Sequence, residues 1–131
     1  MGRYVLDASA LMTFFEDRPG ADKVQELLVK AAGAKRPLLM SVVSWGEVYY
    51  SVWRAHGKSA AEGKLQDIAQ LPVVVVEADP ELTKLAASLK AQHNLPYADC
   101  FAAALCHARK AALATSDKDF ERVAALKVFW I

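Results

Sequence analysis

The sequence predicts an α/β fold with a mainly parallel central sheet of four to five strands. Short apolar runs of strand length alternate along the chain with longer segments of helical periodicity, as in parallel sheets whose strands are joined by crossover helices. The chain has 131 residues, of which 54% are hydrophobic and 24% charged. That length and composition suit a single domain, residues 1–131, and exclude a disordered chain.

The first strand is expected in RYVLDAS, from Arg3 to Ser9, because its apolar run suits a buried position. A helical stretch follows and is broken by Arg-Pro-Gly at 18–20. Residues 21–32 predict a second helix, which Gly33 is positioned to end. A second short strand is expected in PLLM at 37–40.

Residues 41–55 predict a helix, because large apolar side chains recur there at helical spacing. A more polar helix is expected at 58–70. The run PVVVV at 72–76 predicts a strand covered on both faces, since continuous β-branched residues are typical of buried parallel strands. The apolar stripe of the helix predicted at 41–55 consists of Trp45, Val48, Tyr49, Val52 and Trp53.

Asp79 and Pro80 predict the start of a further helix, with Asp as the N-cap and Pro at the first helical position. That helix is expected to run to about residue 93. The remaining elements are expected as a helix at 97–110, a strand at 112–116 and a last edge strand at 127–131.

Four carboxylates differ from the other acidic residues in their surroundings. Asp7, Glu47 and Asp99 lie in apolar stretches with no Lys or Arg within three residues. Asp117 follows the strand expected at 112–116, and ligands of parallel sheets bind at the carboxyl ends of the strands. An unpaired carboxylate is costly to bury, whereas a hard divalent cation such as Mg²⁺ or Mn²⁺ prefers carboxylate ligands.

Each of these acids also has a purely structural explanation. Asp7 could cap the helix that follows its strand. Ser44 and Glu47 match a capping box, and a helical wheel places Glu47 opposite the apolar stripe, on an exposed face. Asp99 could complement a helix dipole in the first turn.

The acids near the C-terminus have structural alternatives as well. Asp117 could be a turn residue after Thr115 and Ser116. Ser116 and Asp119 match a second capping box. Periodicity does not bring the four acids together, because only a tertiary fold can do so.

Four segments, in order along essentially the whole chain, resemble the PIN domain family: VLDASAL, SWGEVYY, LPYADCFAAALC and LATSDKDF. More narrowly, they are similar to the VapC-type ribonuclease toxins of toxin–antitoxin pairs. The resemblance implies a three-layer α/β/α fold with an acidic pocket at the strand ends. It also places Glu47 towards that pocket, against the helical wheel.

The same resemblance implies the roles of individual residues. Mg²⁺ or Mn²⁺ is expected at an acidic quartet that also performs catalysis, namely Asp7, Glu47, Asp99 and Asp117. Supporting roles are expected for Ser9, Thr115 and Asp119. The implied activity is endonucleolytic hydrolysis of RNA that leaves a 3′-hydroxyl and a 5′-phosphate.

The resemblance further implies a homodimer and a cognate VapB-type antitoxin that covers the pocket. The aromatic residues within 45–53 suit either the core or such an interface. The net charge of +1 does not by itself indicate nucleic acid, so local basic residues must hold RNA. The candidates that follow the Glu47 helix are Arg54, Lys58 and Lys64.

Cys100 and Cys106 would be about 9 Å apart along one helix, too far for a disulfide. Reduced thiols, no apolar run long enough for a membrane span and no signal peptide predict a cytoplasmic protein. Two other functions share some of these sequence features. A non-catalytic PIN-like RNA-binding module would lack the complete quartet, and a phospho-receiver domain would need paired acids after its first strand, where Asp7 is followed by Ala8 and Ser9.

Overall fold

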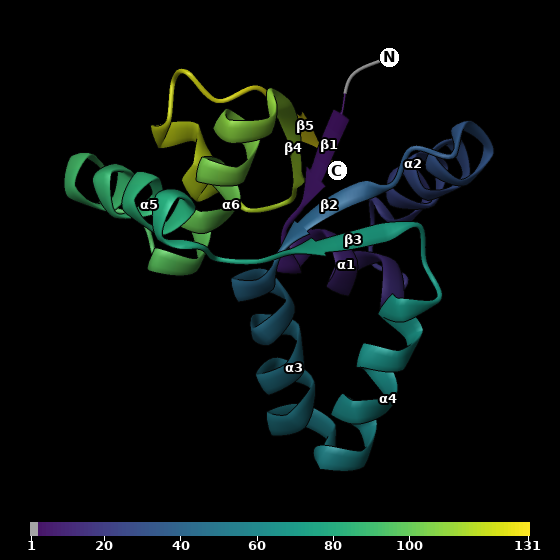
Figure 1. Cartoon of the computed structure of the whole chain (residues 1–131). Coiled ribbons are helices and arrows are strands. Elements are labelled where there is room, and N and C mark those ends of the chain that lie inside the picture. The colour runs from purple at the N-terminus through teal and green to yellow at the C-terminus, as the bar shows by residue number, and fades with distance from the viewer. Residues whose placement is uncertain (1–2) are drawn as a thin grey trace.

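A computed structural model describes residues 3–131 as a five-stranded parallel sheet with helices on both faces (Figure 1). The strand order is β3-β2-β1-β4-β5, and all neighbouring strands pair in parallel. The predicted three-layer α/β/α fold is therefore confirmed. The strands are β1 (Arg3–Leu6), β2 (Leu38–Ser41), β3 (Val73–Val76), β4 (Ala111–Thr115) and β5 (Val128–Trp130).

The helices follow the predicted order. Asp79 is the N-cap of α5, where its Oδ1 accepts a 2.8 Å hydrogen bond from the Leu82 N–H, and Pro80 is the first helical residue, as predicted. The helices are α1 (Ala8–Phe15), α2 (Ala21–Ala34), α3 (Val42–His56), α4 (Lys58–Ala69), α5 (Pro80–Gln92), α6 (Tyr97–Arg109) and the short 3₁₀ helix η1 (Lys118–Arg122).

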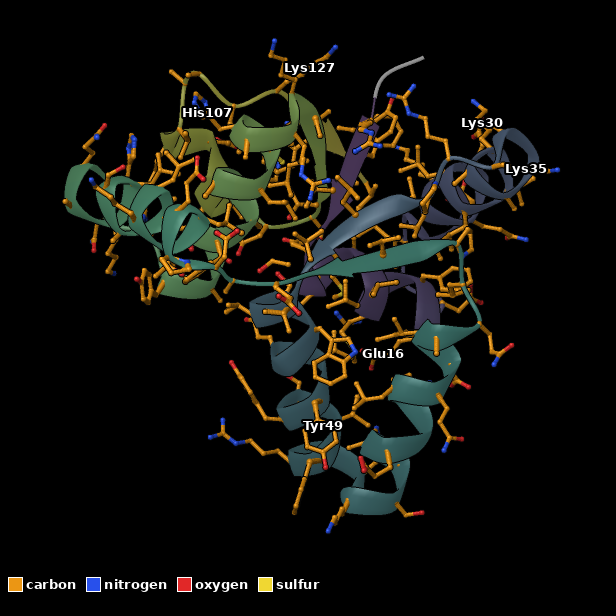
Figure 2. All side chains as sticks on the ribbon, in the orientation of Figure 1. Glu16, Lys30, Lys35, Tyr49, His107 and Lys127 are labelled. Carbon is orange, nitrogen blue, oxygen red and sulfur yellow. The ribbon has the colours of Figure 1, made fainter. Side chains whose placement is uncertain are left out.

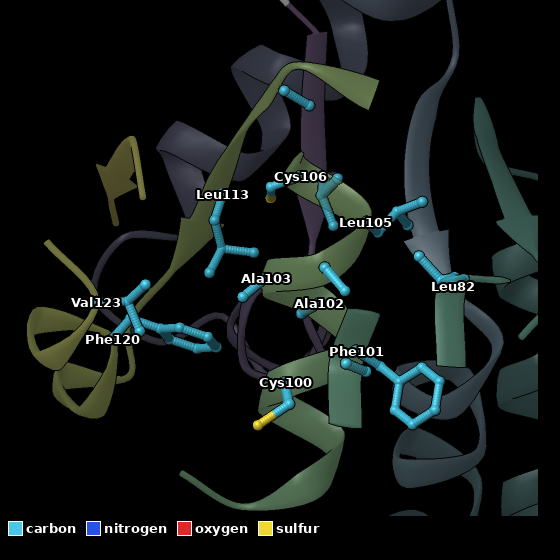
Figure 3. Packing of buried hydrophobic residues seen from close by; sticks show 14 of the residues in the cluster. Leu82, Cys100, Phe101, Ala102, Ala103, Leu105, Cys106, Leu113, Phe120 and Val123 are labelled. Carbon is cyan, nitrogen blue, oxygen red and sulfur yellow. The ribbon is translucent and has the colours of Figure 1, made fainter. Parts of the chain in front are cut away.

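The two faces of the sheet bury separate hydrophobic clusters because side chains alternate along each strand. Val5 and Leu113 contact the cluster formed with α5 and α6, which continues to Phe120 (Figure 3). The next residues along the strands, Leu6 and Ala114, contribute to the cluster formed with α1 to α4. Neighbouring strands thus lie between two apolar layers, which fixes their register and the positions of their carboxyl ends.

The predicted burial of PVVVV on both faces is wrong. β3 pairs only with β2 and forms an edge of the sheet, and the side chain of Val74 is 46% exposed. The opposite edge is β5, as predicted. A β-branched run gives a segment its strand propensity, but the order of strands in the sheet decides how much of it is covered.

Helices α3 and α4 form an arm that extends away from the sheet (Figure 1). Val48 and Val52 of the predicted apolar stripe are buried, whereas Tyr50 and Trp53 are 49% and 44% exposed. The aromatic residues of the arm are therefore only partly core. Cys100 and Cys106 are buried and free on α6, consistent with the predicted reduced thiols. Within residues 3–131, no helix has the length and apolar character needed to cross a membrane.

The prediction that Gly33 ends the second helix is wrong. Helix α2 continues to Ala34, and its C-cap is Lys35 in the left-handed conformation. The glycine required by this region is instead Gly20, which precedes α2 with a φ of +102°. A Cβ at Gly20 would lie 2.7 Å from the backbone carbon of Ile131. Gly20 therefore lets the α1–α2 turn approach the last residue of the chain closely.

Gly20→Ala is expected to destabilise the protein by about 2 kcal/mol, because it combines a positive φ with a steric clash. Gly33→Ala is the matched control: a Cβ there meets nothing within 4 Å, so the change should stabilise helix α2 by about 0.5–1 kcal/mol. Urea unfolding of the two variants would measure both changes. Equal effects of the two substitutions would contradict the role assigned to Gly20.

Candidate functional site

The candidate acids gather at the carboxyl edge of the sheet, where parallel strands end together. Asp7 follows β1 and Asp117 follows β4, and these two strands are direct neighbours. Asp99 lies in the first turn of α6. Glu47 lies on α3, whose N-cap Ser41 is the last residue of β2. The sheet therefore brings together residues that are up to 110 positions apart in the sequence.

Asp7 is buried and fixed by three hydrogen bonds. Its Oδ1 accepts from the Ala10 N–H at 2.9 Å, which caps α1, and from the Ser9 hydroxyl at 2.7 Å. Its Oδ2 accepts from the Thr115 hydroxyl at 2.6 Å. The structural explanation for Asp7, a helix cap, is thus correct, but it does not exclude a second role because each oxygen of a carboxylate can accept more than one contact.

Thr115 connects the first strand to the loop after the fourth. Its hydroxyl is fully buried, donates to Asp7 and accepts from the Asp117 N–H at 3.0 Å. Ser9 lies beside it, with 3.1 Å between the two hydroxyl oxygens, and accepts from the Ser116 N–H at 3.2 Å. The two hydroxyls expected to support the acids therefore hold the β1 and β4 ends in one register.

Three carboxylates form the tightest acidic group. One oxygen each of Asp99, Asp117 and Asp119 lies within 4.8 Å of the other two. Asp119, expected to have only a supporting role, is a member of this group, whereas Asp7 and Glu47 lie around it. Asp119 follows the residue that caps η1, since its backbone N–H donates to Asp117 Oδ1 at 2.9 Å.

Burial and mutual repulsion raise the pKa values of three acids, Asp7, Glu47 and Asp99. Burial raises the pKa of Asp99 to about 7, with further contributions from the charges of Asp117, Asp7, Glu47 and Asp119. The pKa of Glu47 is raised by burial and by the charges of Asp7 and Asp117. Burial also raises the pKa of Asp7, although its hydrogen bonds oppose the change. All five acids are thus close enough to interact electrostatically.

The structural explanations proposed for two acids are wrong. Ser44 does not cap a helix with Glu47, because α3 begins earlier and its N-cap is Ser41, whose side chain accepts from the Val43 N–H. Glu47 is half-buried near the other acids, not on the fully exposed face of the helical wheel. Ser116 likewise does not cap η1, because Asp117 does.

The donor set fits a hard divalent cation. Asp99 Oδ2 is buried and has no hydrogen-bond partner among the described residues, which is costly for a carboxylate unless a cation occupies the remaining coordination position. The Asp117 and Asp119 oxygens nearby are the hard ligands that Mg²⁺ and Mn²⁺ prefer. No histidine or cysteine belongs to this group in residues 3–131, so a softer metal has no favoured ligand there.

The basic residues expected to hold RNA lie on the α3–α4 arm. The Arg54 guanidinium lies 5.2 Å from the Tyr50 ring centroid, and the Lys58 ammonium 5.7 Å from that of Trp53. Lys64 lies 4.3 Å from the Phe15 ring centroid and pairs with Asp67. These contacts anchor the cations on the arm, and their contact with RNA remains a prediction.

Solved structures with the same fold were found. The VapBC2 structure from Rickettsia felis has a TM-score of 0.76 at 17% identity, covering 97% of both chains. The DNA-bound VapBC structure from Salmonella typhimurium has a TM-score of 0.76 at 12% identity, covering 99% of this chain and 98% of that one. The Mycobacterium tuberculosis VapC20 structure, a toxin that cleaves the sarcin–ricin loop, has a TM-score of 0.71 at 16% identity, covering 92% and 95%.

Comparison with curated protein sequences finds no match. The solved structures share the fold at low identity and establish the architecture alone. The family profile of the PIN domain, by contrast, matches residues 4–126, which includes every strand except the last and all the acids described above. Because that match spans nearly the whole chain and agrees with the parallel sheet and its acidic carboxyl edge, this protein belongs to the PIN domain family.

Proposed function

We propose that this protein is a Mg²⁺- or Mn²⁺-dependent endoribonuclease and the toxin of a VapBC-type toxin–antitoxin pair. One observation carries the proposal: Asp99 Oδ2, a buried carboxylate oxygen without a hydrogen-bond partner among the described residues, belongs to a side chain that lies close to two further carboxylates at the carboxyl edge of a PIN-domain sheet. A protein that used these acids only for stability would gain nothing from gathering like charges in one place.

The acids would divide the work according to their surroundings. Asp99, Asp117 and Asp119 would hold the cation, and Asp7 is close enough to interact electrostatically with Asp99. Thr115 and Ser9 keep the Asp7 carboxylate fixed through their hydroxyl donors. When bound, the cation would supply Lewis-acid chemistry, activating water and neutralising negative charge on the phosphate.

Glu47 is suited to ligate the cation or to orient the attacking water. Its carboxylate is half-buried and its pKa is raised by burial and by its acidic neighbours, which makes it a better proton acceptor than an exposed glutamate. Attack of water oxygen on the RNA phosphorus forms the new P–O bond and breaks the bond to the 3′ oxygen. The water proton passes to the Glu47 carboxylate or to solvent, and the departing 3′ oxygen takes up a proton from solvent. The products are then a 3′-hydroxyl and a 5′-phosphate.

The proposed protein partners are suggested by solved structures with the same fold. The Rickettsia felis and Salmonella typhimurium structures contain VapBC pairs. We therefore propose a VapB-type antitoxin that covers the acidic group, a homodimer of this chain and a cytoplasmic location. The exposed Tyr50 and Trp53 of the α3–α4 arm offer an apolar surface for one of these contacts.

Induction of the protein in cells is expected to produce new RNA 5′ ends at defined sites, detected by sequencing of 5′-phosphate ends. Asp7→Asn should abolish them while the protein remains folded, because Asn retains the Oδ1 acceptor that caps α1. Circular dichroism of the variant provides the folding control. A folded Asp7→Asn protein that generates the same 5′ ends would refute the proposed function.

A further inference from the structure

The amino edge of the sheet carries cations where the carboxyl edge carries acids. Because all five strands are parallel, their first residues meet at one edge. Four of the five strands begin at or shortly after a cation, and we call these four residues the cationic edge. They are Arg3 in β1, Arg36 before β2, Lys110 before β4 and Lys127 before β5.

Figure 2 labels one residue of the cationic edge, Lys127, and other basic side chains at the same end of the molecule. The side chains of Lys127 and His107 project at the end of the molecule where β1 begins, and Lys30 and Lys35 of the α2 region project at the same end. Tyr49 of the arm lies at the other end. The acids after β1 and β4 and the cations before them are therefore on opposite ends of the same strands.

Three charges of the cationic edge, those of Arg3, Lys110 and Lys127, have no carboxylate partner among the described residues. In residues 3–131, no carboxylate lies within 4.0 Å of the side-chain nitrogens of Arg3, Lys110 or Lys127. The ion pair between Lys30 and Glu26, at 3.1 Å, involves none of these three cations. An excess of positive charge without acidic partners creates a field that attracts anions.

Two hollows flank the start of β1 and share Arg3 and Tyr4 in their linings. The larger, about 630 Å³, lies between α5 and α6 and has apolar walls that include Leu89 and Leu126. Lys110 and Lys127 line it, and no acidic residue does. The smaller, about 360 Å³, contains one acid, Glu26, which is paired. Cations around apolar hollows with an aromatic side chain suit phosphates and nucleobases together.

Helix geometry explains only part of the pattern. Lys35 and Lys110 cap the carboxyl ends of α2 and α6, where a cation offsets the helix dipole. Arg3 and Lys127 lie at the starts of strands, not at helix ends, so the dipole gives no reason for their charge. A bound anion would give the charges of Arg3 and Lys127 a common role.

We propose that the cationic edge is a second contact surface for RNA, which binds phosphates of the substrate away from the bond that is cut. This inference rests on the proposed ribonuclease function. Arg3 and Asp7 are four residues apart on one extended segment, about 13 Å, so an RNA longer than a few nucleotides can contact both ends of the sheet. The edge then favours long or folded RNA over short fragments.

The test uses the full chain, a fluorescein-labelled 30-nucleotide RNA and EDTA, which prevents cleavage. Fluorescence anisotropy at several salt concentrations measures the affinity. Lys110→Gln with Lys127→Gln should weaken binding about tenfold at low salt and reduce the slope of log affinity against log salt by about 1.4, since each phosphate contact to single-stranded nucleic acid contributes about 0.7.

The control is Arg18→Gln with Lys84→Gln, which removes the same two positive charges from exposed sites outside the cationic edge. An equal loss of RNA affinity in both double variants would overturn the proposal, because the change in net charge alone would explain it. Edge-dependent binding to phosphatidylglycerol vesicles without edge-dependent binding to RNA would also overturn it.

Kinetics with Mn²⁺ separates this inference from the proposed function. The edge variant should raise the KM for the long RNA severalfold and leave kcat for a short oligonucleotide unchanged. If cleavage occurs and the KM for long RNA is unchanged, the edge proposal fails and the ribonuclease stands. If no RNA is cleaved under any condition but binding depends on the edge, the proposed function fails and the RNA contact surface stands.

Discussion

Replacing Asp99 by Asn is expected to lower RNA cleavage by about 10³-fold while making the metal-free protein more stable. The loss of activity follows because the variant removes a charged ligand from the three-carboxylate group. The gain in stability follows because Asp99 is buried, unpaired and surrounded by other acids. If Asp99 served only stability, its replacement would instead lower the stability of the protein and leave the rate of RNA cleavage nearly unchanged.

The stability change has a defined pH dependence. The pKa of Asp99 is raised from 3.8 to about 7, so the folded state binds more protons than the unfolded state between these values. The free energy of unfolding therefore falls as the pH rises from about 4 to 7. At pH 8 the Asn variant should be more stable by about 4 kcal/mol, and below pH 4 the difference should disappear.

Thermal unfolding in EDTA at pH 4 and pH 8 measures this difference, and cleavage assays with Mn²⁺ measure the activity. Asp67→Asn on α4 is the matched control, because Asp67 is exposed and pairs only with Lys64 at the surface, so its loss should change stability by less than about 0.5 kcal/mol. If the Asp99→Asn protein cleaves RNA at the normal rate, or unfolds more easily than the unmodified protein in EDTA, Asp99 is not the metal ligand that we propose.

Removal of divalent cations is expected to stop cleavage completely, and Mn²⁺ or Mg²⁺ should restore it. The same ions should raise the Tm, because they bind the folded protein and offset repulsion among the acids. The apparent affinity should be about tenfold weaker at pH 6 than at pH 8, since Asp99, with a pKa of about 7, must lose its proton before it can bind a cation.

Isothermal titration with Mn²⁺ at the two pH values, beside assays in EDTA, provides the measurement. Asp99→Asn is the control for site-specific binding, because its Tm should respond little to the cation. Undiminished cleavage after exhaustive chelation would contradict the metal-dependent mechanism. An affinity that does not change with pH would exclude Asp99 as the ligand that is protonated in the free protein.

Local sequence signals were sufficient for most elements but not for the environment of each. Asp79 and Pro80 defined the start of α5 because capping depends on a few neighbouring residues. The valine run at 73–76 was correctly predicted as a strand, yet its burial was not, because β3 lies at an edge. The helix end predicted at Gly33 and the capping box at Ser44 were wrong, because both residues lie inside a helix.

The acids themselves were visible in the sequence, whereas their proximity was not. Asp7, Glu47 and Asp99 are conspicuous because a carboxylate in an apolar stretch must be compensated. Nothing in the local pattern indicated that Asp119 would join Asp99 in the closest group or that Asp7 would bind Thr115 across the sheet. Those contacts join segments more than 15 residues apart, beyond the reach of periodicity.

The sequence by itself determined that the chain forms an α/β domain, where its helices and strands begin, and which carboxylates lack local partners. Only the tertiary structure decided which strand is an edge, which face of α3 presents Glu47, and how acids and cations separate to opposite ends of the strands. The physical reason is that propensity and capping act over a few residues, whereas the parallel register aligns distant strand ends through burial of two apolar layers.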